Sequence, residues 1–365
     1  MQLCHDIRSL SQNFQILADF QSAEPYGTGH INDTYAATYR QGGTKIRYIH
    51  QRINRNIFKN PVGLMENIQR VTHHLHAKLA DQPDLTRRAL ALVPACDGQM
   101  FYIDPQGECW RTYVFIEDAR TYDAVESTKQ AYEAAKAFGQ FQGLLADLSA
   151  PRLHDTIPDF HNTPKRFAAL EKTLEADVAN RAKLARAEID FALNRKPITS
   201  RLIDLQSQGV LPERTTHNDT KFNNVMLDDT TQEGLCVIDL DTVMPGLALY
   251  DFGDMVRTTT SPALEDEKDL SKVCMQFPMF EALVRGYLAT AGDVLNKAEK
   301  QHLAFSGKLI SFEIGIRFLA DFLAGDVYFK VHRDGHNLDR CRTQFKLVES
   351  IEIQEEKMNR LVESC

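Results

Sequence analysis

Cysteine is scarce in this chain of 365 residues. Its seven cysteines are an odd number, lie far apart and form no CxxC pair, which argues against a disulfide framework and against a cysteine-ligated zinc site. No apolar run reaches the roughly 20 residues that a membrane-spanning helix needs. The opening stretch, MQLCHDIRSLSQNFQ, lacks the basic and apolar segments of a secretory signal. We therefore expect a cytoplasmic protein with reduced thiols and no membrane partner.

An excess of basic charge is also missing. The chain has 42 Lys and Arg against 50 Asp and Glu, a net charge of −8, whereas nucleic-acid binding depends on clustered cations that neutralise phosphates. This balance disfavours a nucleic-acid partner and favours a small molecule. The hydrophobic content of 43% is typical of a globular protein, and the length exceeds that of one ordinary domain. Two lobes are expected, and a monomer is favoured.

The elements that the sequence predicts fall into two parts. Short segments rich in Tyr, Ile, Val and Phe predict strands over 34–40, 45–53, 99–103 and 110–117. One helix interrupts them over 62–79, where apolar residues recur at helical spacing.

Beyond residue 120 the pattern predicts long helices, over 127–148 and 163–193, then a strand-bearing segment over 214–246 and further helices. The sequence thus predicts an α+β, bilobal fold. Residues 1–117 form a small strand-rich N-lobe with one main helix, and residues 118–365 form a larger, mainly helical C-lobe.

The segment TTHNDTKFNN, residues 215–224, is the most chemically loaded part of the chain. His217, Asp219 and Asn224 fit the pattern HxDxxxxN. Phosphoryl transfer needs one carboxylate beside the attacking hydroxyl and separate oxygen ligands for Mg²⁺, so Asp219 is predicted as the catalytic base and Asn224 as a metal ligand. Asp239, at the end of the strand in LCVIDLD, is the predicted metal carboxylate, because Mg²⁺ takes few protein ligands. His217 is expected to be structural.

Two other motifs invite a functional assignment but favour a structural one. The letters DFG at Asp251–Gly253 are not preceded by a strand like CVID, and we expect a helix start there, capped by Asp251 or Asp254. In THHLHAKL, His73 and His76 have no carboxylate or cysteine nearby in the sequence, so a surface helix is predicted rather than a metal site.

These segments resemble the aminoglycoside phosphotransferase and choline kinase group of protein-kinase-like enzymes. More closely, EPYGTGHINDTY, THNDTKFNN, IDLDTVMPG, DFGD, ALEDEKDLSKV and RFLADFLAGDVYF together resemble the bacterial N-acetylhexosamine 1-kinases, in the same order and through nearly the whole chain. The resemblance implies a protein-kinase-like fold with ATP in the cleft between the lobes. It implies transfer of phosphate to the anomeric C1 hydroxyl of N-acetylglucosamine or N-acetylgalactosamine.

The resemblance also implies an ATP site. Kinases commonly place a Lys or Arg in the third strand to hold the phosphates, but by strand alternation Gln51 takes that place here, unless Arg52 reaches in. Glu66 is the candidate partner of that strand. The remaining ATP contacts are expected from a glycine turn, where backbone N–H groups approach phosphate, and from a hinge that offers backbone groups to adenine: Gly27, Thr28 and Gly29, then Phe115, Ile116 and Glu117.

The sugar contacts that the resemblance implies are His30, Arg317 and Tyr328, together with Asp219 as acceptor of the C1 hydroxyl proton. Taken alone, Glu313, Arg317 and Asp321 recur at i, i+4, which predicts a salt-bridged, solvated helix face. The resemblance assigns Arg317 to the hexosamine instead, since Arg can donate to sugar hydroxyls or to the N-acetyl carbonyl.

Two alternatives stay open. The acceptor could be an aminoglycoside, choline, homoserine or another hexose, for which the net charge of −8 leaves room. From another class, the absence of a clear third-strand Lys allows a nucleotide-binding pseudokinase that serves as an interaction module.

Overall fold

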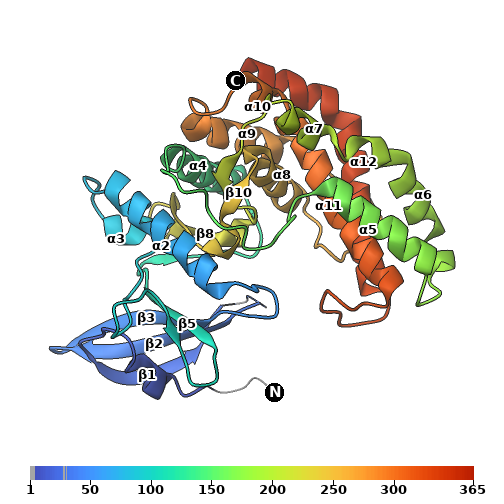
Figure 1. Cartoon of the computed structure of the whole chain (residues 1–365). Helices are drawn as coiled ribbons and strands as arrows, with labels where there is room; N and C mark the ends of the chain where they lie inside the picture. The colour runs from blue at the N-terminus through green and yellow to red at the C-terminus, as the bar shows by residue number, and fades with distance from the viewer. Residues whose placement is uncertain (1–4, 28, 30) are drawn as a thin grey trace.

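The computed structural model of the protein describes residues 5–27, 29 and 31–365. Two predicted site residues, Thr28 and His30, lie outside the described residues. A strand-rich N-terminal part occupies one end of the molecule, and a larger helical part, which contains the C-terminus, occupies the other (Figure 1). None of the helices in the described part of the chain combines the length and the apolar character needed to cross a membrane.

The N-terminal part is built on an antiparallel sheet with the order β1-β2-β3-β5-β4. Its strands are β1 Asp19–Pro25, β2 Asp33–Gln41, β3 Thr44–Arg52, β4 Tyr102–Ile103 and β5 Cys109–Val114. Alternate residues of β2, Tyr35, Ala37 and Tyr39, are buried on one face with Trp110 and the short helix α1, Ile7–Ser11. This period of two follows from the opposite directions of successive side chains in a strand. The strand expected over 99–103 is confined to Tyr102–Ile103.

Helix α2, Pro61–Lys78, lies between the sheet and the helical part (Figure 1). The Asn60 side chain accepts a hydrogen bond from the Gly63 N–H, and Pro61 follows at the first helical position, which together fix the start of the helix. The predicted apolar stripe, Leu64, Ile68, Val71 and Leu75, is buried. The predicted helix is therefore confirmed. A single turn, α3 Leu85–Arg88, follows it.

The helix expected over 163–193 is interrupted. Helix α5, Thr163–Ala176, ends at Asp177, whose φ of 33° is left-handed, and α6, Arg186–Arg195, begins only after a 3₁₀ turn at Ala182–Ala185. The Asp177 carboxylate accepts hydrogen bonds from the backbone N–H groups of Arg181 and Ala182. Aspartate favours turns by this kind of bond to nearby backbone, and helical periodicity alone does not reveal it.

The C-terminal part carries the longest helices and two small sheets. One sheet pairs β7 with β10, and the other has the order β6-β8-β9. The strands are β6 Ala119–Arg120, β7 Arg214–Thr216, β8 Val225–Asp228, β9 Gly234–Val237 and β10 Met244–Gly246. The remaining helices are α4 Thr128–Leu144, α7 Arg201–Ser207, α8 Ala248–Thr259, α9 Phe277–Ala291, α10 Lys297–Gln301, α11 Leu303–Ala324 and α12 His336–Ser364. Short 3₁₀ turns lie at Lys196–Ile198, Phe222–Asn224, Leu240–Thr242 and Leu270–Lys272.

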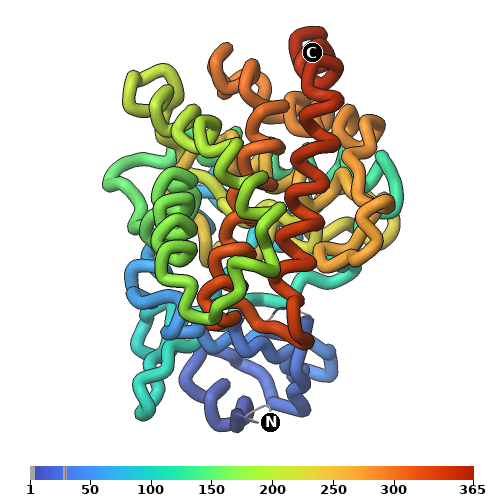
Figure 2. Tube along the Cα trace, turned by 90° about the vertical axis from the view of Figure 1, so that its right-hand side faces the viewer, coloured from blue at the N-terminus to red at the C-terminus, as the bar shows by residue number. Residues whose placement is uncertain are grey.

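Two apolar clusters hold the helical part together. The larger joins α2 to α4, α8 and α9, and so connects the N-terminal part to the helices. The smaller is formed by α5, α6, α11 and α12, which run beside one another in Figure 2. The α2 stripe thus shares the larger cluster with the helices that support the 214–246 segment, and it packs the N-terminal part against that segment.

Glycines let α4 and α9 approach closely. A Cβ at Gly139 would lie 2.5 Å from the Thr290 hydroxyl oxygen, and a Cβ at Gly286 would collide with the Tyr132 carbonyl. We expect Gly286→Ala to lower the free energy of unfolding by about 1–3 kcal/mol, the usual cost of overpacking a core. Chemical denaturation measures the change.

The matched control is Arg285→Ala, on the same helix, which removes only an exposed ion pair with Glu281 and should change the free energy of unfolding by less than about 1 kcal/mol. Equal stability of the two variants would contradict the close packing of α4 against α9.

Candidate active site

The segment 215–224 forms a buried loop between β7 and a short 3₁₀ turn. His217 is fully buried, its Nε2 lies 2.9 Å from the Ile238 carbonyl oxygen, and the Asp219 N–H donates to its Nδ1 at 3.3 Å. The imidazole therefore ties the loop to the hairpin that ends at Asp239. These contacts agree with the structural role expected for His217.

Asp251, in helix α8, holds the same loop through hydrogen bonds to its backbone. Its carboxylate accepts hydrogen bonds from the backbone N–H groups of His217, at 2.9 Å, and Asn218, at 2.6 Å. Burial raises the pKa of Asp251 to about 6, against the effect of His217 and these bonds. The expectation that Asp251 or Asp254 caps a helix was wrong, because α8 already begins at Ala248 and both aspartates lie inside it. The helix itself is present, but Asp251 serves to fix the loop.

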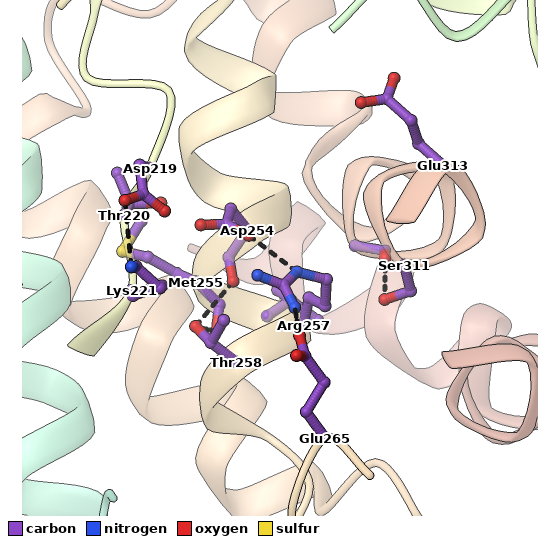
Figure 3. Close-up of polar contacts among 12 residues, drawn as sticks. Asp219, Thr220, Lys221, Asp254, Met255, Arg257, Thr258, Glu265, Ser311 and Glu313 are labelled. Atoms are coloured by element: carbon purple, nitrogen blue, oxygen red, sulfur yellow. Dashed lines mark hydrogen bonds and ion pairs between the residues drawn. The ribbon is translucent and has the colours of Figure 1, made fainter. Parts of the chain in front are cut away.

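Asp219 lies in this loop beside Thr220 and Lys221 (Figure 3), and its side chain is partly buried. The Asn224 side-chain amide donates to the Asp219 backbone oxygen at 2.8 Å and to its carboxylate at 3.0 Å, and the Lys221 ammonium lies 3.2 Å from the same carboxylate oxygen. Desolvation would raise the pKa of Asp219, but Lys221, with His217 and Arg257, outweighs it and holds the pKa below its ordinary value. The carboxylate is therefore ionised and able to accept a proton.

Lys221 was not assigned from the sequence. Its position two residues after Asp219 in the same loop was the available signal. Asp219 raises the pKa of Lys221 above its ordinary value, although desolvation opposes this, so the ammonium stays charged beside the reaction centre.

Asn224 and Asp239 provide a donor set that suits Mg²⁺. Because the Asn224 side-chain nitrogen donates a hydrogen bond to Asp219, the Asn224 side-chain oxygen remains to coordinate a cation. Asp239 follows β9 with a left-handed φ of 59° and is exposed. Desolvation by the surrounding protein, then the nearby carboxylates of Asp241 and Asp219, raise its pKa to about 6, an electrostatic cost that a divalent cation would relieve. The described residues contain no group of three His, Cys, Asp or Glu placed to hold a metal, so a cation here would depend on one carboxylate, one amide oxygen and the ATP phosphates.

The N-terminal sheet faces this site with Gln51 and an arginine that the sequence analysis did not assign, Arg111. The Arg111 Nε donates to the Gln51 side-chain oxygen at 3.0 Å, and its Nη1 pairs with the Asp241 carboxylate. Arg52, by contrast, pairs with Asp33 and Glu108. Strand alternation thus separates Gln51 from Arg52 as expected, and the ion pairs of Arg52 disfavour the alternative that it reaches the nucleotide. Gly27, in the turn before β2, has a φ of 82°, and open space surrounds both Gly27 and Gly29.

Glu66 does not contact the third strand. Its side chain is 54% exposed, and its carboxylate lies 2.6 Å from the His154 Nε2. The expected ion pair between Glu66 and β3 is therefore wrong. The carboxylate that pairs with the sheet at this site is Asp241, which follows β9 and contacts Arg111 of β5.

The predicted hinge residues, Phe115, Ile116 and Glu117, differ in which backbone groups already have hydrogen-bond partners within the protein. The Phe115 N–H donates to the Arg47 carbonyl at 3.2 Å, and the Glu117 carbonyl accepts from the Arg87 Nε at 3.1 Å. In the part of the chain that the structure describes, the backbone N–H and C=O of Ile116 have no such partner. The three residues form the connection to β6, with the backbone of Ile116 left for a ligand.

The i, i+4 acids on α11 do not form a solvated face, so that expectation was wrong. Glu313 is fully buried and bonds to His161 at 2.9 Å and Thr163 at 2.6 Å. Asp321 is buried too, and its carboxylate accepts hydrogen bonds from the backbone N–H groups of the loop that carries Tyr328. Glu313 thus holds the segment at His161–Thr163, and Asp321 holds the loop that carries Tyr328, on either side of Arg317 in the helix.

Arg317 lies in α11, and Tyr328 lies in the loop that follows this helix. The Arg317 guanidinium lies 5.7 Å from the Phe160 ring centre and 5.6 Å from that of Phe329, and it has no hydrogen-bond or ion-pair partner among the described residues. Burial, and then the like charge of Arg166, lower its pKa. Tyr328 is 65% exposed and close enough to influence Arg317 electrostatically.

Asp254 lies between Asp219 and Arg257 (Figure 3). One of its carboxylate oxygens accepts from the Arg257 Nε at 2.8 Å, while the other is buried without a partner. A buried carboxylate oxygen left unpaired is costly. Neither Asp254 nor Arg257 was assigned to the site from the sequence.

A family model described as a phosphotransferase enzyme family matches residues 22–277. The chain belongs to this family. Among solved structures, this phosphotransferase is similar to an aminoglycoside phosphotransferase from Alicyclobacillus acidocaldarius subsp. acidocaldarius DSM 446. That structure is 12% identical with a TM-score of 0.67, and the match covers 100% of this chain and 98% of that chain.

Two further solved structures resemble this phosphotransferase. A spectinomycin phosphotransferase in complex with ADP and spectinomycin is 13% identical, with a TM-score of 0.59 and coverage of 96% of this chain and 97% of that one. A choline kinase from Cryptosporidium parvum Iowa II is 15% identical, with a TM-score of 0.55 and coverage of 98% of both chains. These likenesses show the fold. The predicted α+β, protein-kinase-like fold is confirmed, and the chain is a small-molecule phosphotransferase.

Proposed function

We propose that this phosphotransferase uses ATP and Mg²⁺ to phosphorylate the anomeric C1 hydroxyl of N-acetylhexosamines, giving the sugar 1-phosphate. The observation that carries the choice of acceptor is the partly buried Arg317 guanidinium, which has no hydrogen-bond or ion-pair partner among the described residues. A partly desolvated cation of this kind is stabilised by an acceptor group on a ligand. The carbonyl of an N-acetyl group and sugar hydroxyls are such acceptors, and the resemblance in sequence points to the same class.

The acceptor side offers both kinds of hydrogen-bonding group. Arg317 donates, and the ionised carboxylate of Asp219, which is only partly buried, accepts. A polyhydroxylated, uncharged molecule satisfies both, because each hydroxyl donates one hydrogen bond and accepts others. Arg166 and Arg257 add positive charge near Arg317, which opposes a cationic acceptor such as choline or an aminoglycoside.

In the proposed mechanism, Asp219 accepts the proton of the sugar C1 hydroxyl while the oxygen of that hydroxyl attacks the γ-phosphorus. Asn224 fixes the orientation of the Asp219 carboxylate, and Lys221 keeps it ionised and adds positive charge beside the transferring group. The Asn224 oxygen and Asp239 would hold Mg²⁺, which supplies charge neutralisation at the phosphates. The bond from the γ-phosphorus to the bridging oxygen breaks, and ADP leaves.

The test of the proposal is ADP release with Mg-ATP against a panel of acceptors: N-acetylglucosamine, N-acetylgalactosamine, glucose, choline, homoserine and kanamycin. Turnover confined to the N-acetylhexosamines, with the product confirmed by phosphorus NMR, supports the proposal. Turnover on another acceptor alone would retain the phosphotransferase and overturn the acceptor. ATP binding without turnover on any acceptor would favour a nucleotide-binding pseudokinase.

Arg317→Met should lower kcat/KM for the N-acetylhexosamine by about 10–100-fold, because a charge-assisted hydrogen bond contributes about 1.5–3 kcal/mol. The KM for ATP should stay close to wild type, since Arg317 lies on the acceptor side.

Arg186→Met is the control for Arg317→Met, because Arg186 is exposed and pairs only with Asp190 on its own helix. An unchanged kcat/KM in Arg317→Met would remove Arg317 from the acceptor site.

A further inference from the structure

Kinases of this fold usually hold the ATP phosphates with a third-strand Lys that pairs with a helix Glu, and neither member of that pair is present here. Gln51 occupies the strand position, and Glu66 on α2 is 54% exposed against His154. Both arginines of the third strand are engaged elsewhere, because Arg47 pairs with Glu117 and Arg52 with Asp33 and Glu108. The lysine of this strand, Lys45, is exposed at the opposite end of the strand from Gln51, across from Arg40. A cation for the phosphates must therefore come from another element.

Arg111, on the neighbouring strand β5, is the cross-strand partner of Gln51 and so shares its face of the sheet. The Arg111 side chain is 1% exposed. Its Nε donates to the Gln51 side-chain oxygen at 3.0 Å, while the Gln51 side-chain nitrogen donates to the Thr34 hydroxyl at 2.9 Å. A row of polar side chains across β2, β3 and β5 thus fixes the guanidinium in one orientation.

The carboxylate partner of Arg111 comes from the catalytic hairpin. Asp241, two residues after Asp239, pairs with the Arg111 Nη1, and its other oxygen accepts from the Asn32 side-chain nitrogen at 2.6 Å. Asn32 follows the glycine turn. Arg111 therefore sits where three elements meet: the glycine turn, the sheet and the hairpin that carries the predicted metal ligand.

We propose that Arg111 is the phosphate-binding cation of this phosphotransferase, and that Asp241 replaces the helix Glu as the carboxylate that positions it. A guanidinium has five N–H donors, of which one bonds Gln51 and one bonds Asp241, so further N–H groups remain for oxygens of the α- and β-phosphates. The inference rests on the proposed use of ATP. It also implies that Asp241 ties the phosphate-binding cation directly to the metal hairpin, without help from α2.

The test compares the binding of Mg-ATP and of adenosine by isothermal titration calorimetry, because adenosine lacks the phosphates. Removing only Arg111 would leave Asp241 buried and unpaired, which is strongly destabilising, so the main variant is the neutral double substitution Arg111→Gln with Asp241→Asn. We expect its affinity for Mg-ATP to fall by about 10–100-fold, as for loss of a charge-assisted bond. Its affinity for adenosine should be unchanged.

Two further variants separate phosphate binding from a structural role. Asp241→Asn alone keeps the guanidinium and leaves an amide oxygen that can still accept its hydrogen bond, so it should lose less affinity for Mg-ATP than the double variant. Arg52→Gln, on the other face of the same sheet, should bind both ligands like the wild type. Equal loss of ATP and adenosine in the double variant, or ATP binding as tight as in the wild type, would overturn the proposal.

The outcome is independent of the acceptor, because no sugar takes part in the binding measurement. A wild-type protein that binds Mg-ATP and phosphorylates no N-acetylhexosamine contradicts the proposed function alone. Loss of ATP affinity in Arg52→Gln, with the double variant unaffected, contradicts the role of Arg111 alone.

Discussion

Asp219→Asn is expected to lower kcat by about 10²–10⁴-fold, the usual contribution of a general base. The substitution keeps the size of the side chain but removes the oxygen that accepts the hydroxyl proton. It also removes the negative charge beside Lys221, which lies 3.2 Å away. Initial rates of ADP release with saturating Mg-ATP and N-acetylglucosamine measure the change.

The fold of Asp219→Asn should be intact, because the loop is held by Asp251 and His217 rather than by the Asp219 carboxylate. A thermal unfolding curve checks this. Asp229→Asn is the control, since Asp229 lies in the β8–β9 turn and pairs with Arg120. Near wild-type kcat in Asp219→Asn would remove Asp219 from the chemistry.

The sequence predicted those parts of the site that lie close together in the chain. Asp219 and Asn224 share one loop, and Asp239 follows the next hairpin, so their spacing alone placed them together. The structure brings them together with Lys221, which the same spacing could have revealed. Local pattern also gave the alternation of the third strand and the apolar stripe of α2.

The sequence analysis failed where a side chain depends on a partner far away in the chain. The Arg111–Asp241 pair joins residues from separate lobes, and no periodicity links them. Asp251 looked like a cap because its bonds to the loop at 217–218 are not visible locally. Glu313 looked solvated because its partner, His161, comes from another segment. In each case a buried charge needed a partner, and only the tertiary structure supplies it.

In the proposed mechanism, the loop that carries Asp219 serves two tasks. The Asn224 amide nitrogen orients the base, which leaves the amide oxygen of the same side chain for a cation. The base and the metal ligand are therefore mechanically linked. A change at Asn224 should disturb both the orientation of Asp219 and the binding of Mg²⁺, whereas a change at Asp239 should act through the metal alone.

Asp239→Asn is accordingly expected to lower kcat/KM at ordinary Mg²⁺ concentrations by about 100-fold or more, because even groups outside the ligand sphere commonly cost 10–100-fold. Raising the Mg²⁺ concentration should recover part of the activity, since the amide oxygen remains a weak ligand. Titrations of activity against Mg²⁺ at fixed ATP, and calorimetry of ADP with and without Mg²⁺, measure the effect.

Asn224→Ala should raise the Mg²⁺ requirement as well, but excess Mg²⁺ should not recover its kcat, because Asp219 has lost the hydrogen bond that orients it. This difference separates the two residues. Asp229→Asn again provides the control from the same hairpin. If Asp239→Asn showed a wild-type dependence on Mg²⁺, Asp239 would be excluded as a metal ligand. Its raised pKa would then reflect only its place among the other two carboxylates, Asp219 and Asp241, in a partly desolvated cleft.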